Sequence, residues 1–155
     1  MRAWTIAAWL LQAVLNPQET PHLQLKTSAS RAAAAPGAKV TLQLDVTPKP
    51  KMHVYAPGQD GYIPIQLTLT GDPAFTAAKA KYPAGEKYVM PALNETQLVY
   101  AAPFRVTQEI TVTRAAAGTV HVKGSVRYQA CDEAICYLPK TVPVEWTIAV
   151  ATPRL

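Results

Sequence analysis

Both cysteines of the chain lie in one short stretch, Tyr128-Gln129-Ala130-Cys131-Asp132-Glu133-Ala134-Ile135-Cys136-Tyr137-Leu138-Pro139. Apolar residues alternate before this stretch at Val120, Val122, Val126 and Tyr128, and after it at Val142, Val144, Trp146, Ile148 and Val150. The four residues between the cysteines suit a tight hairpin loop. Residues opposed across such a hairpin have Cβ atoms about 4.5 to 5.5 Å apart, close to the roughly 3.8 Å of a disulfide. The sequence therefore predicts a β-ribbon whose tip can carry a reversible disulfide.

The apolar residues of the ribbon also predict its register. If Cys131 opposes Cys136 and pairing continues regularly, Val142 faces Ser125 and the apolar faces fall out of step. One extra residue on the outgoing strand restores three matched pairs, which are Val142 with Val126, Val144 with Gly124, and Trp146 with Val122. We therefore predict a bulge within residues 137–140 and a buried Trp146.

Short strand-like runs fill the rest of the chain. The clearest is residues 39–46, where Val40, Leu42, Leu44 and Val46 share one face. Other runs cover residues 23–27, 52–55, 63–69 and 98–113. Residues 75–82 could form a strand or one helical turn, and residues 83–91 are rich in turn formers. Frequent prolines and no convincing amphipathic helix after residue 16 indicate an all-β, antiparallel β-sandwich.

The first sixteen residues stand apart from this pattern. Arg2 provides a positive start, and the run from Ala3 to Leu15 is almost entirely apolar, which fits a secretory signal. The run is short for a transmembrane helix, which needs about 20 apolar residues. We expect residues 1–16 to be a cleaved signal, with an uncleaved anchor or a buried helix as alternatives. Outside the cytosol, a cysteine pair can stay oxidised or take part in exchange.

Composition supports one folded domain over residues 17–155. The chain is 49% hydrophobic and only 16% charged, so it is not a disordered tail. Its formal charge is +5, but the lysines and arginines are scattered and are not interleaved with aromatic residues. We therefore expect a mildly basic solvated surface and no nucleic-acid partner.

The cysteine stretch, followed by Thr141-Val142-Pro143-Val144, resembles the active hairpin of the amino-terminal periplasmic domain of DsbD, a membrane thiol-disulfide interchange protein. Two further segments support the resemblance, His53-Val54-Tyr55-Ala56-Pro57-Gly58 and Asn94-Glu95-Thr96-Gln97-Leu98-Val99-Tyr100. The similarity spans about residues 22–150, and this chain would be a stand-alone form of the domain. The resemblance implies an immunoglobulin-like sandwich, located in the periplasm and soluble once the signal is cleaved, or membrane-anchored if it is not.

The resemblance also implies a function. Domains of this kind take electrons from a thioredoxin-like domain and pass them to periplasmic disulfide isomerases and cytochrome-maturation thioredoxins. Cys136 would form the mixed disulfide and Cys131 would resolve it, so the activity would be of the protein-disulfide reductase type. No metal or organic cofactor is expected, and any reductant, such as a membrane electron carrier, would be a separate protein.

Two groups of residues would surround the cysteine pair. The flanking residues would be Tyr128, Gln129, Asp132, Glu133, Tyr137 and Pro139. A mobile cap loop would shield the pair, with Tyr88, Met90, Asn94 and Glu95 as its candidate residues.

The charges near the cysteines bear on their reactivity. Asp132 and Glu133 lie between the thiols, and nearby negative charge raises the pKa of a thiol. Arg127 and Lys140 would offset this effect only in part. The sequence therefore favours a relay that reacts with an activated thioredoxin-type thiolate over a strongly activated nucleophile.

Two alternatives remain open from the residues alone. The disulfide could merely staple the hairpin of an exported binding or scaffold module, where so small a loop would contribute about 2 kcal/mol. Alternatively, the chain could bind copper through soft or borderline ligands, namely Cys131, Cys136, His53, His121 and Met90. Their separations match no recognised ligand spacing, which counts against copper.

Overall fold

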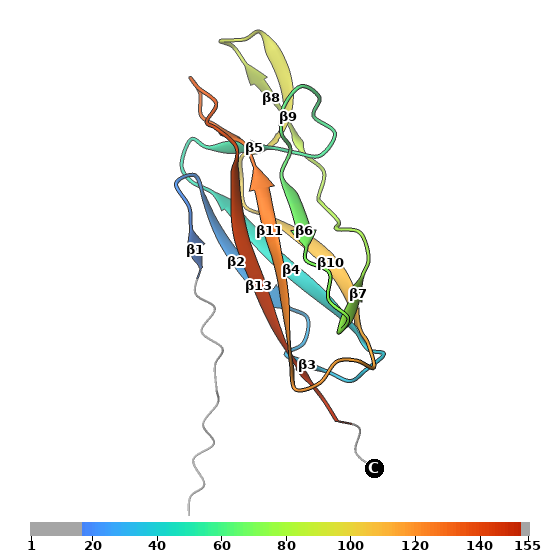
Figure 1. Cartoon of the computed structure of the whole chain (residues 1–155). Helices are drawn as coiled ribbons and strands as arrows, with labels where there is room; N and C mark the ends of the chain where they lie inside the picture. The colour runs from blue at the N-terminus through green and yellow to red at the C-terminus, as the bar shows by residue number, and fades with distance from the viewer. Residues whose placement is uncertain (1–16, 153–155) are drawn as a thin grey trace, which may run out of the picture.

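The computed structural model describes residues 17–152, so the expected signal at residues 1–16 lies outside the described part. Within these described residues, three sheets make up the fold (Figure 1). The first contains, in spatial order, β1 (Gln18–Glu19), β2 (Leu23–Ala29), β4 (Lys39–Pro48), β10 (Phe104–Val112) and β7 (Phe75–Ala77). The second contains β3 (Ala33–Ala34), β13 (Lys140–Val150), β11 (Thr119–Tyr128) and β6 (Gln66–Leu69). The third contains β12 (Ala130–Cys131), β5 (His53–Tyr55), β9 (Glu95–Tyr100) and β8 (Glu86–Met90).

The first two sheets pack face to face as an immunoglobulin-like sandwich, which confirms the expected fold class. Strand β4 buries every second residue, as its alternating sequence predicted. Trp146 is 3% exposed, and its indole Nε1 donates a hydrogen bond to the Gln43 carbonyl oxygen at 3.0 Å. Because Trp146 lies in β13 and Gln43 in β4, this bond connects the two sheets. The interior between them is mostly aliphatic.

The ribbon of β11 and β13 has the predicted register. Cys131 faces Cys136 at the tip, while Val142 faces Val126 and Trp146 faces Val122 further down. The register of the Cys131–Cys136 pair is offset by one residue from the register of the Val126–Val142 pair. The outgoing strand therefore carries one extra residue between the tip and Lys140. The predicted bulge is confirmed, and it lets the ribbon bury its apolar face while the cysteines stay opposed.

The third sheet is built from chain segments that adjoin the long strands of the sandwich. Strand β5 follows β4, β9 precedes β10, and β12 follows β11, each after a short interruption. Proline residues occupy the first two interruptions, where Pro50 and Pro103 cannot donate to a ladder. The interruptions redirect the chain, and β5 pairs with both β9 and β12 at the end of the sandwich (Figure 1). The ribbon tip lies at this end.

Two segments differ from or refine their expectations. The turn-rich residues 83–91 contain the strand β8, which pairs with β9 to form a hairpin. For residues 75–82 the sequence allowed either a strand or one helical turn. They form the strand β7 and a further β-bridge between Lys81 and Thr107. No helix of residues 17–152 is long and apolar enough to span a membrane.

Candidate functional site

The two cysteines form a disulfide at the ribbon tip, with Cα atoms 4.0 Å apart. Cys131, the last residue of β12, is 0% exposed. Cys136, on the other side of the loop, is exposed to solvent. The arrangement therefore offers one sulfur to a reagent from outside and shields the other.

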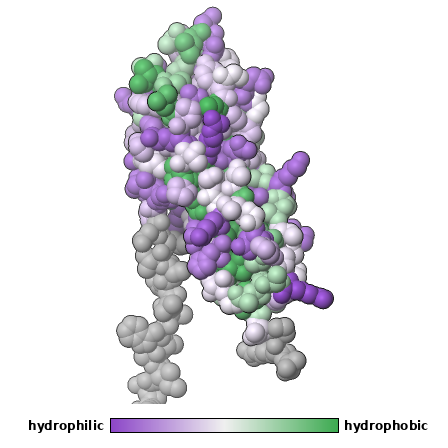
Figure 2. All heavy atoms as spheres, in the orientation of Figure 1, coloured by the Kyte–Doolittle hydropathy of each residue, from purple (hydrophilic) through white to green (hydrophobic). Residues whose placement is uncertain are grey.

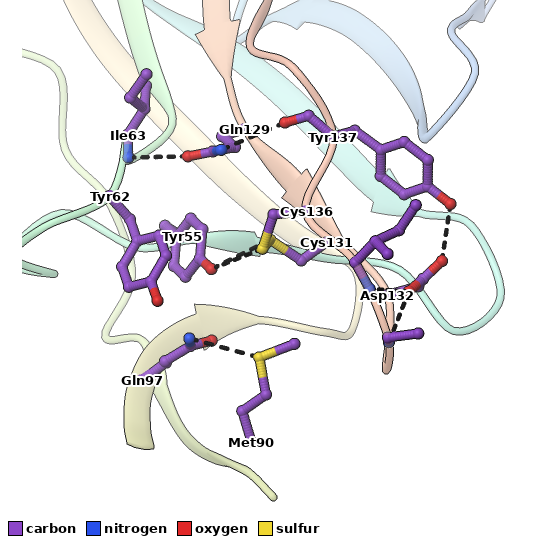
Figure 3. The surroundings of a disulfide bond; sticks show 12 residues. Tyr55, Tyr62, Ile63, Met90, Gln97, Gln129, Cys131, Asp132, Cys136 and Tyr137 are labelled. Atoms are coloured by element: carbon purple, nitrogen blue, oxygen red, sulfur yellow. Dashed lines mark hydrogen bonds between the residues drawn. A yellow bond between two sulfur atoms is a disulfide. The ribbon is translucent and has the colours of Figure 1, made fainter. Parts of the chain in front are cut away.

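The loop between the cysteines is held by the carboxylate of Asp132. Its Oδ1 accepts hydrogen bonds from the backbone N–H groups of Ala134 and Ile135, both at 2.8 Å. Its Oδ2 accepts one from the Tyr137 hydroxyl at 2.7 Å (Figure 3). These bonds, led by the one from Ile135, lower the pKa of Asp132 to about 2. The negative charge expected between the thiols is present, and the loop itself stabilises it.

A tyrosine hydroxyl contacts both sulfur atoms. The Tyr55 hydroxyl oxygen lies 3.1 Å from Cys131 Sγ and 3.4 Å from Cys136 Sγ (Figure 3). Burial raises the pKa of Tyr55 to about 12, with smaller contributions from Tyr62 and Glu95. The phenol therefore keeps its proton at neutral pH and can donate it in a hydrogen bond to a sulfur that becomes negatively charged.

The half-buried Tyr62 packs against the fully buried Tyr55. The two rings stack with centroids 4.4 Å apart. The Tyr62 hydroxyl donates to Glu95 Oε2 at 2.8 Å, so this stack is tied to the β8–β9 hairpin.

The four candidate cap residues all lie in or between β8 and β9. Tyr88 is half-buried and packs its ring on that of His53, with centroids 4.7 Å apart. Met90 is buried, and its Sδ accepts a hydrogen bond from Gln97 Nε2 at 3.6 Å. Asn94, with φ of 51°, lies in the turn, and the exposed Glu95 begins β9. The structure thus places a paired hairpin beside the disulfide, where we expected a loop.

The flanking residues expected from the sequence separate into two groups. Gln129 connects the ribbon to the preceding segment, since Nε2 donates to the Tyr137 carbonyl at 3.3 Å and Oε1 accepts from Ile63 N–H at 3.4 Å. Glu133 and Pro139 are exposed. Tyr128, however, is buried in the core of the sandwich, where its hydroxyl pairs with Thr20 Oγ1 at 3.0 Å. Its side chain supports the fold and does not face the sulfurs.

Large exposed apolar side chains gather around the disulfide end. We call this group the apolar rim, and its members are Val89, Leu93, Ile135 and Leu138. Two lie in the β8–β9 hairpin and two in the ribbon tip. Leu138 is 87% exposed. Figure 2 shows strongly hydrophobic residues in green at this end of the molecule, where the two hairpins project in the same view of Figure 1, and further green patches lower on the same face.

The copper alternative gains no support from the arrangement. Within residues 17–152, no group of three or more His, Cys, Asp or Glu side chains is placed to hold a metal ion. Both cysteines are bonded to each other, and His121 pairs its Nδ1 with Glu145 at 2.7 Å on the sandwich.

Comparison with known proteins now decides the family. A family model described as thiol:disulfide interchange protein DsbD, N-terminal, matches residues 20–147. The chain belongs to this family. Membership confirms the resemblance, and the cysteine pair of the resembling hairpin is present as a disulfide.

Solved structures add a likeness of fold. The N-terminal periplasmic domain of ScsB from Proteus mirabilis superposes with a TM-score of 0.54 at 11% identity, over 84% of this chain and 49% of that one. This chain therefore spans about half the length of that structure. The N-terminal domain of DsbD from Neisseria meningitidis, in its reduced form, gives a TM-score of 0.45 at 22% identity, over 76% of this chain and 80% of that one. A search of the curated proteins finds no match.

Three buried residues near the disulfide were not among the exchange-site residues expected from the sequence, although His53 was a candidate ligand in the copper alternative. Tyr55 contacts the sulfurs, His53 pairs with Cys131, and Gln97 contacts Met90 in the β8–β9 hairpin. Each occupies an inward position of a strand that otherwise buries apolar residues, so a polar residue at a core position was the available signal. That signal was weak because β5 is only three residues long.

Proposed function

We propose that this domain is exported and exchanges electron pairs with thioredoxin-fold proteins through Cys131 and Cys136. The observation that carries the proposal is the unequal access to the two sulfurs, with Cys136 exposed and Cys131 buried against the Tyr55 hydroxyl. An exposed sulfur can be attacked in line by an incoming thiolate.

The reaction has two steps. A partner thiolate attacks Cys136 Sγ, the bond between the two sulfurs breaks, and Cys131 leaves with the electron pair and takes up a proton. The partner's second thiolate then attacks the mixed disulfide, releasing Cys136 as a thiolate that is protonated in turn. The partner becomes oxidised to a disulfide, and the domain gains two electrons and two protons. The reverse sequence passes the same electrons to an oxidised acceptor.

The remainder of the site suits these steps. Tyr55 can donate a hydrogen bond to the departing Cys131 sulfur, and the apolar rim offers a surface that a partner can cover. The partners proposed are a thioredoxin-like electron donor on a separate protein, such as a membrane electron carrier, and periplasmic disulfide isomerases or cytochrome-maturation thioredoxins as acceptors. The β8–β9 hairpin, with Tyr88, Met90, Asn94 and Glu95, would act as the cap.

A trapping experiment tests the proposal. The Cys131→Ala variant, with Cys136 free, is mixed with a thioredoxin that keeps only its attacking cysteine, activated as a mixed disulfide with thionitrobenzoate, and adducts are quantified on non-reducing gels and by mass spectrometry. We expect a stable mixed disulfide through Cys136. The matched control carries Cys131→Ala, Cys136→Ala and Glu133→Cys, which places an exposed thiol elsewhere in the same loop. Equal yields from control and test variants would contradict the proposal, as would the absence of any adduct.

A further inference from the structure

His53 lies directly across from the buried cysteine. It is the first residue of β5 and pairs with Cys131 in the antiparallel register of β5 and β12. Side chains so paired project from the same face of a sheet, with Cβ atoms about 4.5 to 5.5 Å apart. Tyr55, two residues later, projects from that face as well and contacts Cys131 Sγ. The imidazole, the phenol and the shielded sulfur therefore share one face of the third sheet.

The imidazole is enclosed but incompletely bonded. His53 is 2% exposed, and its ring packs against those of Tyr88 and Tyr55. Its Nε2 has no hydrogen-bond partner among residues 17–152. A buried nitrogen left unpaired costs about 1 to 3 kcal/mol, and this nitrogen is free to take up a proton or a new hydrogen bond during a reaction.

The surroundings keep this imidazole in its neutral form, which is the form that can accept a proton. Burial lowers the pKa of His53, and the negative charge of Asp132 raises it in part. The other titratable groups that pack against the ring are the phenols of Tyr55 and Tyr88. His53 is therefore neutral near pH 7, with the carboxylate of Asp132 available to favour the imidazolium once it forms.

We propose that His53 is the proton acceptor for the Cys131 thiol when Cys131 attacks the mixed disulfide held on Cys136. This inference rests on the proposed exchange function and assigns one of its steps. The proton moves from Cys131 Sγ to the imidazole, and Cys131 attacks Cys136 Sγ. The Cys131–Cys136 bond forms, and the partner's sulfur leaves as a thiolate. In the opposite direction the imidazolium returns the proton to Cys131 as that sulfur departs from Cys136.

The two steps can be timed separately with a small reagent. The reduced domain is mixed with dithiobis-nitrobenzoate, and thionitrobenzoate release is followed by stopped flow from pH 5.5 to 8.5. The first phase reports attack by the exposed Cys136 on the reagent. The second phase reports attack by Cys131 on the resulting mixed disulfide. We expect His53→Gln to slow the second phase about tenfold or more at pH 7 and to leave the first phase unchanged.

His22→Gln is the matched control. His22 is also buried, and its Nδ1 also lacks a partner among residues 17–152. Its ring packs on that of Tyr137 with centroids 4.5 Å apart, whereas the residue paired with Cys131 is His53. We expect this variant to keep both phases. A second phase in His53→Gln equal to that of the unaltered chain would overturn the inference, as would an equal slowing in His22→Gln.

The same experiment separates the two proposals. If the unaltered chain shows no first phase, the proposed function loses its accessible sulfur. If the first phase is present and the rate of the second phase is the same in His53→Gln and in the unaltered chain, only the role of His53 as proton acceptor is contradicted. Should His53→Gln not fold, the unaltered chain is measured in heavy water, where proton transfer to His53 predicts a slower second phase and an unchanged second phase contradicts it.

Discussion

The sandwich and the disulfide end of this molecule are built from different kinds of side chain. In the sandwich, long strands such as β4 and β11 bury alternate aliphatic residues, and the core around Trp146 is closed. At the disulfide end the strands are short, buried residues include His53 and Gln97, and large apolar side chains face solvent.

This difference separates stability from chemistry. Burial of aliphatic surface stabilises the sandwich, whereas the disulfide end holds unpaired polar atoms and exposed apolar surface that would each lower the stability of an ordinary domain. Such features persist where a partner or a reaction uses them. Changes in the sandwich should therefore alter stability with little effect on sulfur chemistry, and changes at the disulfide end should do the reverse.

The largest expected effect is in the sandwich core. Trp146→Ala should lower the free energy of unfolding by about 3 to 5 kcal/mol, because it empties a buried volume between the sheets. Urea denaturation measures the change. The matched control is Leu138→Ala at the exposed apolar rim, which should stay within about 0.5 kcal/mol. A comparable loss from both would mean that the two regions are not energetically distinct.

A close approach of two strands gives the next effect. A Cβ at Gly124 in β11 would lie 2.7 Å from the backbone oxygen of Thr68 in β6, so the strands must move apart. Gly124→Ala should destabilise the chain by about 1 to 3 kcal/mol in the same denaturation assay. Gly71→Ala is the control, since a Cβ there meets nothing within 4 Å. Equal stability of the two variants would contradict the close packing of β6 on β11.

At the disulfide end, the expected effect is on rate. Tyr55→Phe removes the hydroxyl that contacts both sulfurs, and hydrogen bonds to charged groups contribute about 1.5 to 3 kcal/mol. We expect reduction of the disulfide by dithiothreitol to slow about tenfold, with little change in unfolding. The control is Tyr100→Phe, because the Tyr100 hydroxyl that it removes donates a hydrogen bond to the Pro83 carbonyl oxygen and does not contact a sulfur. Equal reduction rates in Tyr55→Phe and the unaltered chain would show that the phenol does not assist the leaving sulfur.

The smallest effect concerns the loop between the cysteines. Because its hydrogen bonds lower the pKa of Asp132 from 3.8 to about 2, the folded state favours the carboxylate. The stability this provides is present above pH 3.8 and is lost as the pH falls towards 2. An NMR titration of the Ala134 and Ile135 amides should have its midpoint near pH 2. Tyr137→Phe should raise that midpoint, and a midpoint at the ordinary value in both chains would contradict the bonded loop.

Much of the sandwich and the ribbon could be predicted because their information is local. Alternation in β4 showed which face is buried, and the apolar positions on β11 and β13 required the one-residue offset near Tyr137. The opposed cysteines followed from the loop length between these strands.

The third sheet was harder because its strands form through distant pairings. Strand β8 contains no clear alternation and is flanked by turn formers, so only its pairing with β9 defines it as a strand. The contact of Tyr55 with the sulfurs depends on β5 meeting β12, which are far apart in sequence. Asp132 was expected only as a negative charge between the thiols, and its bonds to the loop depend on backbone geometry that the residue types do not reveal.

The most direct test of the central claim is the reduction potential of the Cys131–Cys136 pair. The domain is equilibrated with defined thiol-disulfide couples, quenched by alkylation, and the reduced fraction is read by mass spectrometry. An exchange site predicts a midpoint above about −300 mV, in the range of thioredoxin-fold couples, with ready reduction by thioredoxin. A midpoint below about −300 mV, together with resistance to thioredoxin, would instead identify a structural disulfide and contradict the account.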